Sequence, residues 1–337
     1  MAITTFDRTA LLGVLERFPQ QRIVMLGDLV ADESVYGEIA RVSREAPVLI
    51  LKERERQVAP GGGANAANNL AALGAQVSMV GVVGEDDSGD ALLRYFREKR
   101  ISTRHIVRLR DYLTPTKSRI LGGLSHWQRQ QIVRVDREPA EPLPAKVRAG
   151  LTHSAAALLG SCSGLLVADY GYCATSAREV SSLGRQARRK GLPVTIDSRY
   201  DLPAYQDVTA ATPNEPELEA VYNQPIGNDL ERLHELGRKF LRRQRLQALL
   251  VTRGRDGMAL FEPRRPPRHI PVFGPDQAVD VTGAGDTVIA TFTLGLAAGA
   301  SFLEAALIAN IAGGLVVMKR GTATVALSEI REAIRNA

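Results

Sequence analysis

The stretch Asp280-Val-Thr-Gly-Ala-Gly-Asp286 is followed at once by a helical run over residues 287–298. Glycines at the start of a helix let the backbone approach an anion closely. The free N–H groups and the positive end of the helix dipole then bind that anion. We therefore expect Gly283, Ala284 and Gly285 to form an anion-binding cradle.

An acidic residue stands at the same helix start. Asp286 would repel a bound phosphate, which is unexpected in a site that only binds phosphate. It fits a general base that takes a proton from a hydroxyl while the cradle stabilises charge on a transferring phosphoryl group. The alternative is an ordinary acidic residue in the first helical turn.

Outward from this motif, short apolar runs alternate with helical patterns. Strands are predicted at 23–27, 77–83, 164–168, 194–196 and 248–252, and helices at 64–73, 88–99, 176–190, 287–298, 303–318 and 328–335. Strands that alternate with helices indicate a parallel sheet covered on both faces. The predicted fold class is therefore α/β.

Two segments interrupt this alternation. Residues 35–58 and 116–135 alternate polar and apolar side chains without a helix between them, which is typical of half-exposed antiparallel strands. We expect one α/β domain over residues 1–337, with a small β lid whose strands lie within about 33–60 and 112–136. The alternative is that these strands extend the edge of the main sheet.

Composition excludes several classes of protein. The 337 residues are 45% hydrophobic and 24% charged, as in a soluble globular chain. An apolar run of ~20 residues that would span a membrane does not occur, and residues 1–19 lack the apolar core of a signal peptide. The two cysteines, Cys162 and Cys173, are expected to be reduced thiols in a cytoplasmic protein.

The charge balance bears on the ligand. Forty-three basic and 37 acidic residues give a net charge of +6, and the arginines are mixed with acidic residues along the chain. This distribution argues against nucleic acid as a partner and favours an anionic small molecule.

A second glycine motif, Pro60-Gly-Gly-Gly-Ala-Asn65, leads into the predicted helix at 64–73. Gly61, Gly62 and Gly63 would permit close approach of the backbone to a ligand. Asn65 offers a donor and an acceptor that suit sugar hydroxyls. A flexible loop that happens to precede a helix is the alternative.

A third motif, Thr212-Pro-Asn-Glu-Pro-Glu217, precedes another helix. Asn214 and Glu217 lie on one face of a helical turn, where they could bind hydrated Mg²⁺, with Glu217 as its carboxylate through water. The alternative is a capping box in which Asn214 caps the helix and Glu217 is its acidic partner.

Four further acidic residues follow predicted strands. They are Asp28 and Asp32 after the first strand, Asp169 after the strand at 164–168, and Asp197 after the strand at 194–196. Ligands of open α/β sheets bind at the carboxyl ends of strands, so we expect one or two of these residues in the site and the others in turns.

Together these motifs resemble the ribokinase-like (phosphofructokinase-B) family of sugar kinases. Gly61-Gly-Gly-Ala-Asn65 with Gly74 and Gly84 resembles its first signature, and Asp280 to Asp286 its second. The resemblance covers the chain from about Arg22 to its end. It implies a Rossmann-like, doubly wound, mostly parallel sheet with a small β-strand lid, and phosphorylation of a sugar hydroxyl by ATP.

The resemblance also implies roles for individual residues. Asp286 corresponds to the catalytic base and Gly283, Ala284 and Gly285 to the anion hole. Asp32 corresponds to the acidic residue that binds sugar hydroxyls. The nucleotide and Mg²⁺ positions are Asn214, Glu215, Pro216, Glu217, Thr252, Gly254 and Asn310. Members of the family are often stimulated by K⁺.

A narrower resemblance is to the kinases of D-glycero-D-manno-heptose 7-phosphate, which phosphorylate the anomeric hydroxyl and yield heptose 1,7-bisphosphate. It is carried by Tyr36-Gly-Glu-Ile-Ala-Arg41, Thr116-Lys-Ser-Arg119, Gln130-Gln-Ile-Val-Arg134 and Lys319-Arg-Gly-Thr. Arg41, Lys117, Arg119 and Arg134 are basic residues of the predicted lid that suit the phosphate of such a sugar; solvated lid side chains are the alternative.

Departures from this pattern concern the substrate. Where heptose kinases carry Asp-Pro-Lys, this chain has Asp197-Ser198-Arg199, and lysine and arginine are not equivalent at a phosphate site. A kinase of the same family acting on fructose, ribose or a hexose phosphate is the alternative. A non-catalytic sugar or nucleotide sensor is a remote one, because Asp286 and the cradle are intact. Exposed lid strands invite pairing with a second copy, so we expect a homodimer through the lid.

Overall fold

The computed structural model describes residues 7–123, 130–275 and 277–337. Its strands are β1 (Arg22–Gly27), β2 (Leu29–Val42), β3 (Leu49–Gly62), β4 (Gln76–Gly84), β5 (Ser102–Leu109), β6 (Thr116–Gly123), β7 (Gln130–Arg137), β8 (Gly164–Asp169), β9 (Val194–Ser198), β10 (Ala210–Ala211), β11 (Ala248–Thr252), β12 (Met258–Phe261) and β13 (Arg268–Ile270). Its α-helices are α1 (Arg8–Leu15), α2 (Gly63–Ala72), α3 (Asp87–Glu98), α4 (Ala145–Leu158), α5 (Ala177–Arg189), α6 (Glu215–Tyr222), α7 (Leu230–Arg243), α8 (Ala284–Ala297), α9 (Phe302–Val316) and α10 (Leu327–Asn336). None of the helices in these ranges combines the length and apolar composition that crossing a bilayer requires.

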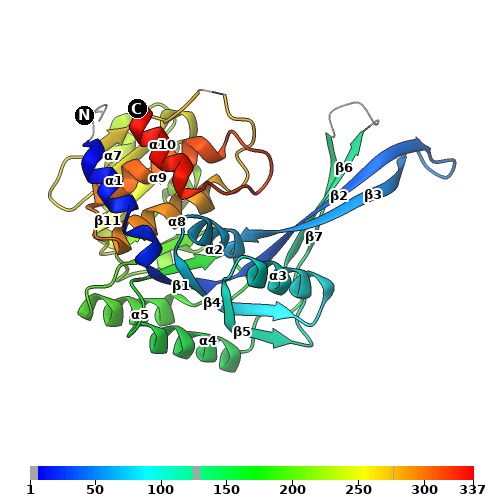
Figure 1. Cartoon of the computed structure of the whole chain (residues 1–337), viewed down its shortest axis with the longest axis horizontal. Helices are drawn as coiled ribbons and strands as arrows, with labels where there is room; N and C mark the ends of the chain where they lie inside the picture. The colour runs from blue at the N-terminus through cyan, green and yellow to red at the C-terminus, as the bar shows by residue number, and fades with distance from the viewer. Residues whose placement is uncertain (1–6, 124–129, 276) are drawn as a thin grey trace.

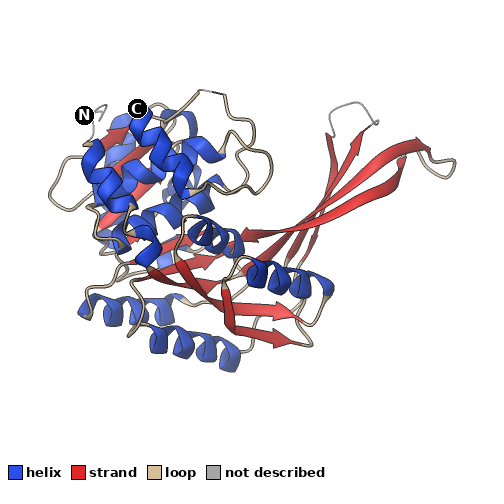
Figure 2. Ribbon diagram, viewed as in Figure 1, coloured by secondary structure: helices blue, strands red, loops and turns tan. Residues whose placement is uncertain are grey.

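The described residues form a nine-stranded main sheet with the order β13-β12-β11-β10-β9-β8-β1-β4-β5. Every pairing from β11 to β5 is parallel, and only β12 and β13 join in antiparallel fashion at one edge. Helices cover both faces (Figure 2). The α/β prediction is confirmed, because the buried strands are apolar throughout and require cover on both sides.

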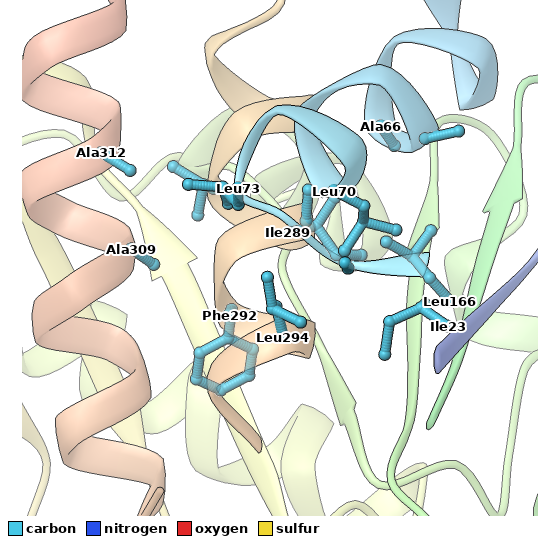
Figure 3. Close-up of a cluster of buried hydrophobic side chains, with 14 of the residues drawn as sticks. Ile23, Ala66, Leu70, Leu73, Leu166, Ile289, Phe292, Leu294, Ala309 and Ala312 are labelled. Carbon is cyan, nitrogen blue, oxygen red and sulfur yellow. The ribbon is translucent and has the colours of Figure 1, made fainter. Parts of the chain in front are cut away.

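Two apolar layers flank this sheet. One contains α1, α2, α3, α8, α9 and α10, and the other contains α4, α5, α6 and α7. In the first layer, Phe292 and Ile289 of α8 pack between Leu70 of α2 and Ala309 of α9 (Figure 3). Phe292 is fully buried, and truncating such a side chain to alanine costs about 3–5 kcal/mol. This packing fixes the amino-terminal end of α8, where the Gly-Ala-Gly-Asp motif lies.

A second, four-stranded sheet has the order β3-β2-β6-β7 and extends away from the α/β body (Figure 1). It is separate from the main sheet, which excludes the alternative of extra edge strands. The β2–β3 and β6–β7 pairs are antiparallel as expected, but β2 and β6 are parallel. The chain passes through β4, α3 and β5 before β6, and so returns to the second sheet at the end where β2 started. Residues 124–129 of the predicted segment lie outside the described residues.

Candidate active site

The Gly-Ala-Gly-Asp motif forms the first turn of α8. Gly283 is the residue before the helix and has a left-handed conformation, with φ +76°. A Cβ atom at this position would lie 2.6 Å from Nδ2 of Asn65, so glycine is required both for the backbone angle and for space. Asp280 accepts hydrogen bonds from the N–H groups of Thr282 (2.9 Å) and Gly321 (2.8 Å), which fixes the loop that enters the helix.

The carboxylate of Asp286 is buried and accepts hydrogen bonds on both oxygens. Nδ2 of Asn65 donates to Oδ2 at 2.8 Å, and the hydroxyl of Tyr170 donates to Oδ1 at 2.5 Å. Burial raises the pKa of Asp286 from its ordinary 3.8 to about 6, against the opposing effect of these two hydrogen bonds. The group is therefore a moderately strong base that is ionised at neutral pH.

Asp286 lies in the wall of a cleft of ≈ 380 Å³, here named the polar cleft. Its lining residues are Val30, Asp32, Gly62, Lys117, Arg119, Tyr170, Asp197, Arg199, Thr212, Asn214, Glu217, Thr252, Val281, Thr282, Gly283, Gly285, Asp286 and Thr322. The main sheet supplies the strand ends at Asp197 and Thr252, and the small sheet supplies Asp32, Lys117 and Arg119.

Opposite charges are mixed in the polar cleft. Arg119 pairs with Asp32 through Nη1 and Oδ1 at 2.8 Å. Burial and the nearby charges of Asp286 and Glu217 raise the pKa of Asp197 well above its usual range. Burial, followed by the charge of Arg199, lowers the pKa of Lys117. Carboxylates that repel one another beside cationic side chains suit a ligand that carries both phosphate and a metal cation.

A second, mostly apolar hollow of ≈ 430 Å³ adjoins the polar cleft, and we name it the apolar pocket. It is lined by Thr252, Gly254, Arg255, Gly257, Met258, Val272, Pro275, Ala278, Val281, Ala284, Gly285, Val288, Asn310, Gly313, Gly314 and Val317. Thr252, Val281 and Gly285 belong to both linings, so the two spaces meet at the start of α8. A flat apolar group in the pocket would place an attached anionic chain over the Gly283–Gly285 cradle.

Asn214 and Glu217 satisfy both alternatives raised by their sequence. Oδ1 of Asn214 accepts from the N–H of Glu217 at 2.8 Å, and Oε2 of Glu217 accepts from the N–H of Asn214 at 2.9 Å. This is a complete capping box at the start of α6. Both side chains also line the polar cleft. Burial raises the pKa of Glu217, which is partly offset by these hydrogen bonds and by the charge of Arg199.

Two of the four acidic residues at strand ends reach the polar cleft and two do not. Asp32 and Asp197 line it. The carboxylate of Asp28 instead accepts hydrogen bonds from the N–H groups of residues 170, 172 and 174, and that of Asp169 accepts from Ser198, Tyr205 and Gly171. This agrees with the expectation that one or two of the four lie in the site; as candidates for substrate contact, Asp28 and Asp169 are corrected, because they do not line the cleft and both carboxylates stabilise the loop after β8 and its neighbours.

The second glycine motif also differs from expectation. Only Gly62 lines the polar cleft; a Cβ at Gly61 would lie 2.8 Å from Cγ of Asp32, and one at Gly63 would lie 2.2 Å from Cε of Met25. These glycines therefore allow close approach of protein groups. Asn65 is fully buried and donates to Asp286, so it positions that carboxylate and is not placed to bind sugar hydroxyls.

Of the other predicted residues, four lie outside both spaces and two line the apolar pocket. Glu215 forms a buried ion pair with Arg253, Nε to Oε2 at 2.7 Å, and Pro216 is exposed. Arg41 is exposed on the outer part of β2. Arg134 pairs with Asp136 at 2.8 Å and lies opposite Arg119 on the small sheet, one strand further from the cleft. Gly254 and Asn310 line the apolar pocket, where Asn310 is oriented by the carbonyl of Pro271.

Two polar side chains that line the cleft were not among the expected site residues: Tyr170, and Arg199, which the sequence indicated only as a departure from the lysine of heptose kinases. Tyr170 directly follows Asp169 at the end of β8, and Arg199 follows Asp197 and Ser198 at the end of β9. Their place at the carboxyl ends of buried strands is the signal that could have identified them. Thr322 was also missed, although it lies in the Lys319-Arg-Gly-Thr segment.

Comparison with known proteins places this geometry in a family. A model of the pfkB family carbohydrate kinases matches residues 20–329. The chain belongs to the pfkB family of carbohydrate kinases. It is therefore a sugar kinase, a phosphotransferase with an alcohol group as acceptor.

Curated relatives narrow the resemblance within that family. The chain is 36% identical over 329 residues to the bifunctional protein HldE of Pelobacter propionicus, covering 97% of this chain and 66% of that one. It is 39% identical over 318 residues to the bifunctional protein HldE of Coxiella burnetii, covering 94% of this chain and 64% of that one. The chain thus spans just under two thirds of the length of these relatives.

Solved structures agree with the family's fold. Ribokinase of Arabidopsis thaliana, complexed with ribose and ATP, superposes with a TM-score of 0.69 at 20% identity, over 94% of this chain and 98% of that one. Phosphofructokinase-2 of Escherichia coli, in complex with substrates and products, gives 0.73 at 17% identity, over 94% and 99%. The ribokinase-like fold expected from the sequence is confirmed.

Proposed function

We propose that this kinase transfers the γ-phosphate of ATP to the anomeric hydroxyl of D-glycero-D-manno-heptose 7-phosphate, giving heptose 1,7-bisphosphate. The observation that carries the reaction is Asp286, a buried carboxylate in the wall of the polar cleft at the start of α8. With a pKa of about 6, it is ionised at neutral pH and accepts the hydroxyl proton as the oxygen attacks phosphorus.

The two adjoining spaces suit the two substrates. The apolar pocket suits the adenine ring, and the Gly283–Gly285 cradle lies where the pocket meets the polar cleft, so it is placed for the phosphates of ATP. The sugar then occupies the polar cleft beside Asp32. Lys117, Arg119 and Arg199 supply three cationic side chains there, which favours a sugar that itself carries a phosphate.

Mg²⁺ fits the donors of the polar cleft. Glu217 and Asp197 face it, and their mutual repulsion, which contributes to the raised pKa of Asp197, would be relieved by a divalent cation. When bound, Mg²⁺ neutralises charge on the transferring phosphoryl group. We also propose that K⁺ stimulates the reaction, as the family resemblance implies.

The small sheet is proposed to act as a lid over the polar cleft and as the contact between two copies. Side chains alternate along β6, so Lys117 and Arg119 face the cleft while Ile120 faces the other way. That outer face has a hollow of ≈ 540 Å³ lined by apolar side chains such as Leu49, Ile132 and Val133, which are about half exposed. A second copy of the same sheet would cover it.

A substrate panel tests the proposed reaction. ADP release is measured with ATP and Mg²⁺ and, separately, heptose 7-phosphate, fructose 6-phosphate, fructose and ribose, each with and without K⁺. Turnover on heptose 7-phosphate alone is expected, and Asp286→Asn provides the background. Turnover on another sugar alone would contradict the substrate while leaving the reaction in place.

Light scattering tests the proposed dimer. The wild-type protein is expected to have the mass of two chains at micromolar concentration, and Ile132→Asp is expected to dissociate it because the charge would be buried in the contact. Leu230→Asp, which changes a comparably exposed residue at the start of α7, is the matched control. A wild-type mass of one chain would contradict the proposal.

A further inference from the structure

Tyr170 is placed to act on the proposed base. It follows β8 directly, lines the polar cleft, and donates a hydrogen bond from its hydroxyl to Oδ1 of Asp286 at 2.5 Å. Asn65 donates to the other oxygen. One donor on each oxygen fixes the plane of the carboxylate, and each oxygen retains a second acceptor position for the proton of a substrate hydroxyl.

Groups from three other parts of the chain surround Tyr170 and fix its position. The N–H of Tyr170 donates to Oδ2 of Asp28 at 2.7 Å, and the same carboxylate accepts from the N–H groups of Tyr172 and Ala174. A Cβ at Gly62 would lie only 3.2 Å from the ring edge, so glycine makes room for it. Nζ of Lys117 lies 5.9 Å from the ring centroid. Since Gly62 belongs to β3 and Lys117 to β6, the ring lies beside residues from both halves of the small sheet.

We propose that Tyr170 is a positioning residue for catalysis: its hydroxyl keeps the carboxylate of Asp286 oriented and ionised, and its ring links that carboxylate to the lid strands. This inference rests on the proposed function, in which Asp286 is the base. A hydroxyl that donates to a carboxylate favours the charged form, whereas burial favours the neutral form. Burial and the charge of Asp286 raise the pKa of Tyr170 well above its usual range, so the hydroxyl keeps its proton and always donates.

The charges around Asp286 belong to several elements. Asp32 of β2 and Lys117 of β6 act on it directly, Asp197 of β9 interacts with it, and Arg199 and Glu217 line the same cleft. Tyr170→Phe leaves all of these in place and removes one oxygen atom. Any change in the titration of Asp286 in this variant therefore reports the hydroxyl.

The first test uses unfolding and does not depend on activity. Melting temperatures of wild type and Tyr170→Phe are compared from pH 5 to pH 8. At pH 5 Asp286 is largely protonated, so the hydrogen bond that the variant lacks would join two neutral groups. At pH 8 the same hydrogen bond joins the hydroxyl to a charged carboxylate and is roughly twice as strong. The gap between the two melting temperatures is therefore expected to widen as pH rises. A gap that is constant with pH would overturn the proposal.

Tyr172→Phe is the matched control. Tyr172 lies two residues away, and its hydroxyl donates to the exposed Glu138 at 2.8 Å, outside the polar cleft. Tyr172→Phe also removes one tyrosine hydroxyl but leaves both hydrogen bonds to Asp286 in place, so the gap between this variant and wild type is expected not to follow the titration of Asp286.

The second test is the pH profile of kcat/KM with the sugar that the wild type phosphorylates. For Tyr170→Phe we expect the acid limb to move up by about one pH unit, because a lost charge-assisted hydrogen bond raises the pKa of the base. Turnover then recovers towards wild type at high pH. A uniform loss at every pH, with the limb unmoved, would overturn the proposal. Full turnover in Asp286→Asn would instead refute the base, and thus the proposed function, while the unfolding test still decides whether the hydroxyl stabilises the charged carboxylate.

Discussion

Replacing Asp286 by asparagine tests two properties of this carboxylate: its contribution to turnover and its effect on the free energy of unfolding. The side chain is 6% exposed, and burial raises its pKa from 3.8 to about 6. Asparagine has nearly the same shape and can still accept the hydroxyl of Tyr170, but it does not ionise and cannot take a proton.

The magnitude follows from linkage. A group whose pKa is raised on folding contributes stability that is fully present below its unfolded pKa and is lost as pH rises through its folded pKa. For Asp286 this window runs from pH 3.8 to about 6, and a difference of about two pH units corresponds to about 3 kcal/mol. The asparagine variant lacks this loss. Relative to wild type, the free energy of unfolding of the variant should therefore increase by about 3 kcal/mol between pH 4 and pH 7.

The assay is thermal unfolding of both proteins in steps from pH 4 to pH 8. With about 2.1 cal/mol/K per residue, a chain of 337 residues unfolds with an entropy of about 0.7 kcal/mol/K, so the melting temperature of the variant should rise by about 4 °C relative to wild type. The new amide group faces the donor of Asn65 at every pH. This contact changes the melting temperature of the variant by the same amount across the pH range and leaves its trend with pH unaffected. Asp229→Asn, at the exposed cap of α7, makes the same replacement away from the polar cleft and keeps the cap, because asparagine caps helices as well as aspartate does, so it serves as the control.

Turnover in the same variant should fall by about 10²–10⁴-fold, the usual contribution of a general base, while calorimetry should find ATP binding nearly unchanged. Near-normal turnover would remove Asp286 from the chemistry. Parallel melting curves would show that burial does not raise its pKa, and the linkage argument would fail.

Further predictions concern the rest of the site. The kcat/KM of the wild type should fall below pH about 6 as Asp286 becomes protonated, and a flat profile between pH 5 and 8 would contradict this. Gly283→Ala should lower both the melting temperature and turnover, because its Cβ would lie 2.6 Å from Nδ2 of Asn65 and its φ of +76° is strained, at a cost of at least about 1–2 kcal/mol. Arg199→Gln should raise KM for a phosphorylated sugar by about 10-fold or more, with a smaller change for an unphosphorylated one in the same assay. Glu217→Gln should raise the Mg²⁺ concentration needed for half-maximal turnover, and unchanged Mg²⁺ dependence would exclude its proposed role.

Features that depend on neighbouring residues could be predicted from the sequence. The anion cradle and the acidic residue at the start of α8 are consecutive, so their relation follows from helix geometry alone. The capping box could be predicted for the same reason, because Asn214 and Glu217 are only three positions apart. Alternation of polar and apolar side chains was sufficient to predict the strands of the small sheet, because the period of two is a local property. The same pattern carries no information on pairing, and the parallel contact between β2 and β6 was not expected.

Roles that depend on distant partners could not be predicted in this way. Asp28 and Asp32 are four positions apart and both follow the predicted strand at 23–27, so residue type and sequence position make them equivalent candidates. The difference lies in what faces them: three N–H groups of the loop after β8 saturate Asp28, more than 140 positions away, whereas Arg119 pairs with Asp32 at the cleft wall. Asn65 likewise has the hydrogen-bonding groups that a sugar needs, but Asp286, 221 positions away, uses its donor.

Asp28, Gly62, Asn65 and Tyr170 nevertheless act together around Asp286. Asp28 fixes the loop that carries Tyr170, Gly62 makes room for its ring, and Asn65 and Tyr170 together orient Asp286. Three of the four were candidates for substrate contact from the sequence, and all four support Asp286, the proposed base. A buried carboxylate needs donors on both oxygens to stay charged, and the chain has to bring those donors from separate elements. Several polar residues near the site therefore act on the protonation state of Asp286. For this reason, removing the single hydroxyl of Tyr170 should change the pH dependence of stability by a measurable amount.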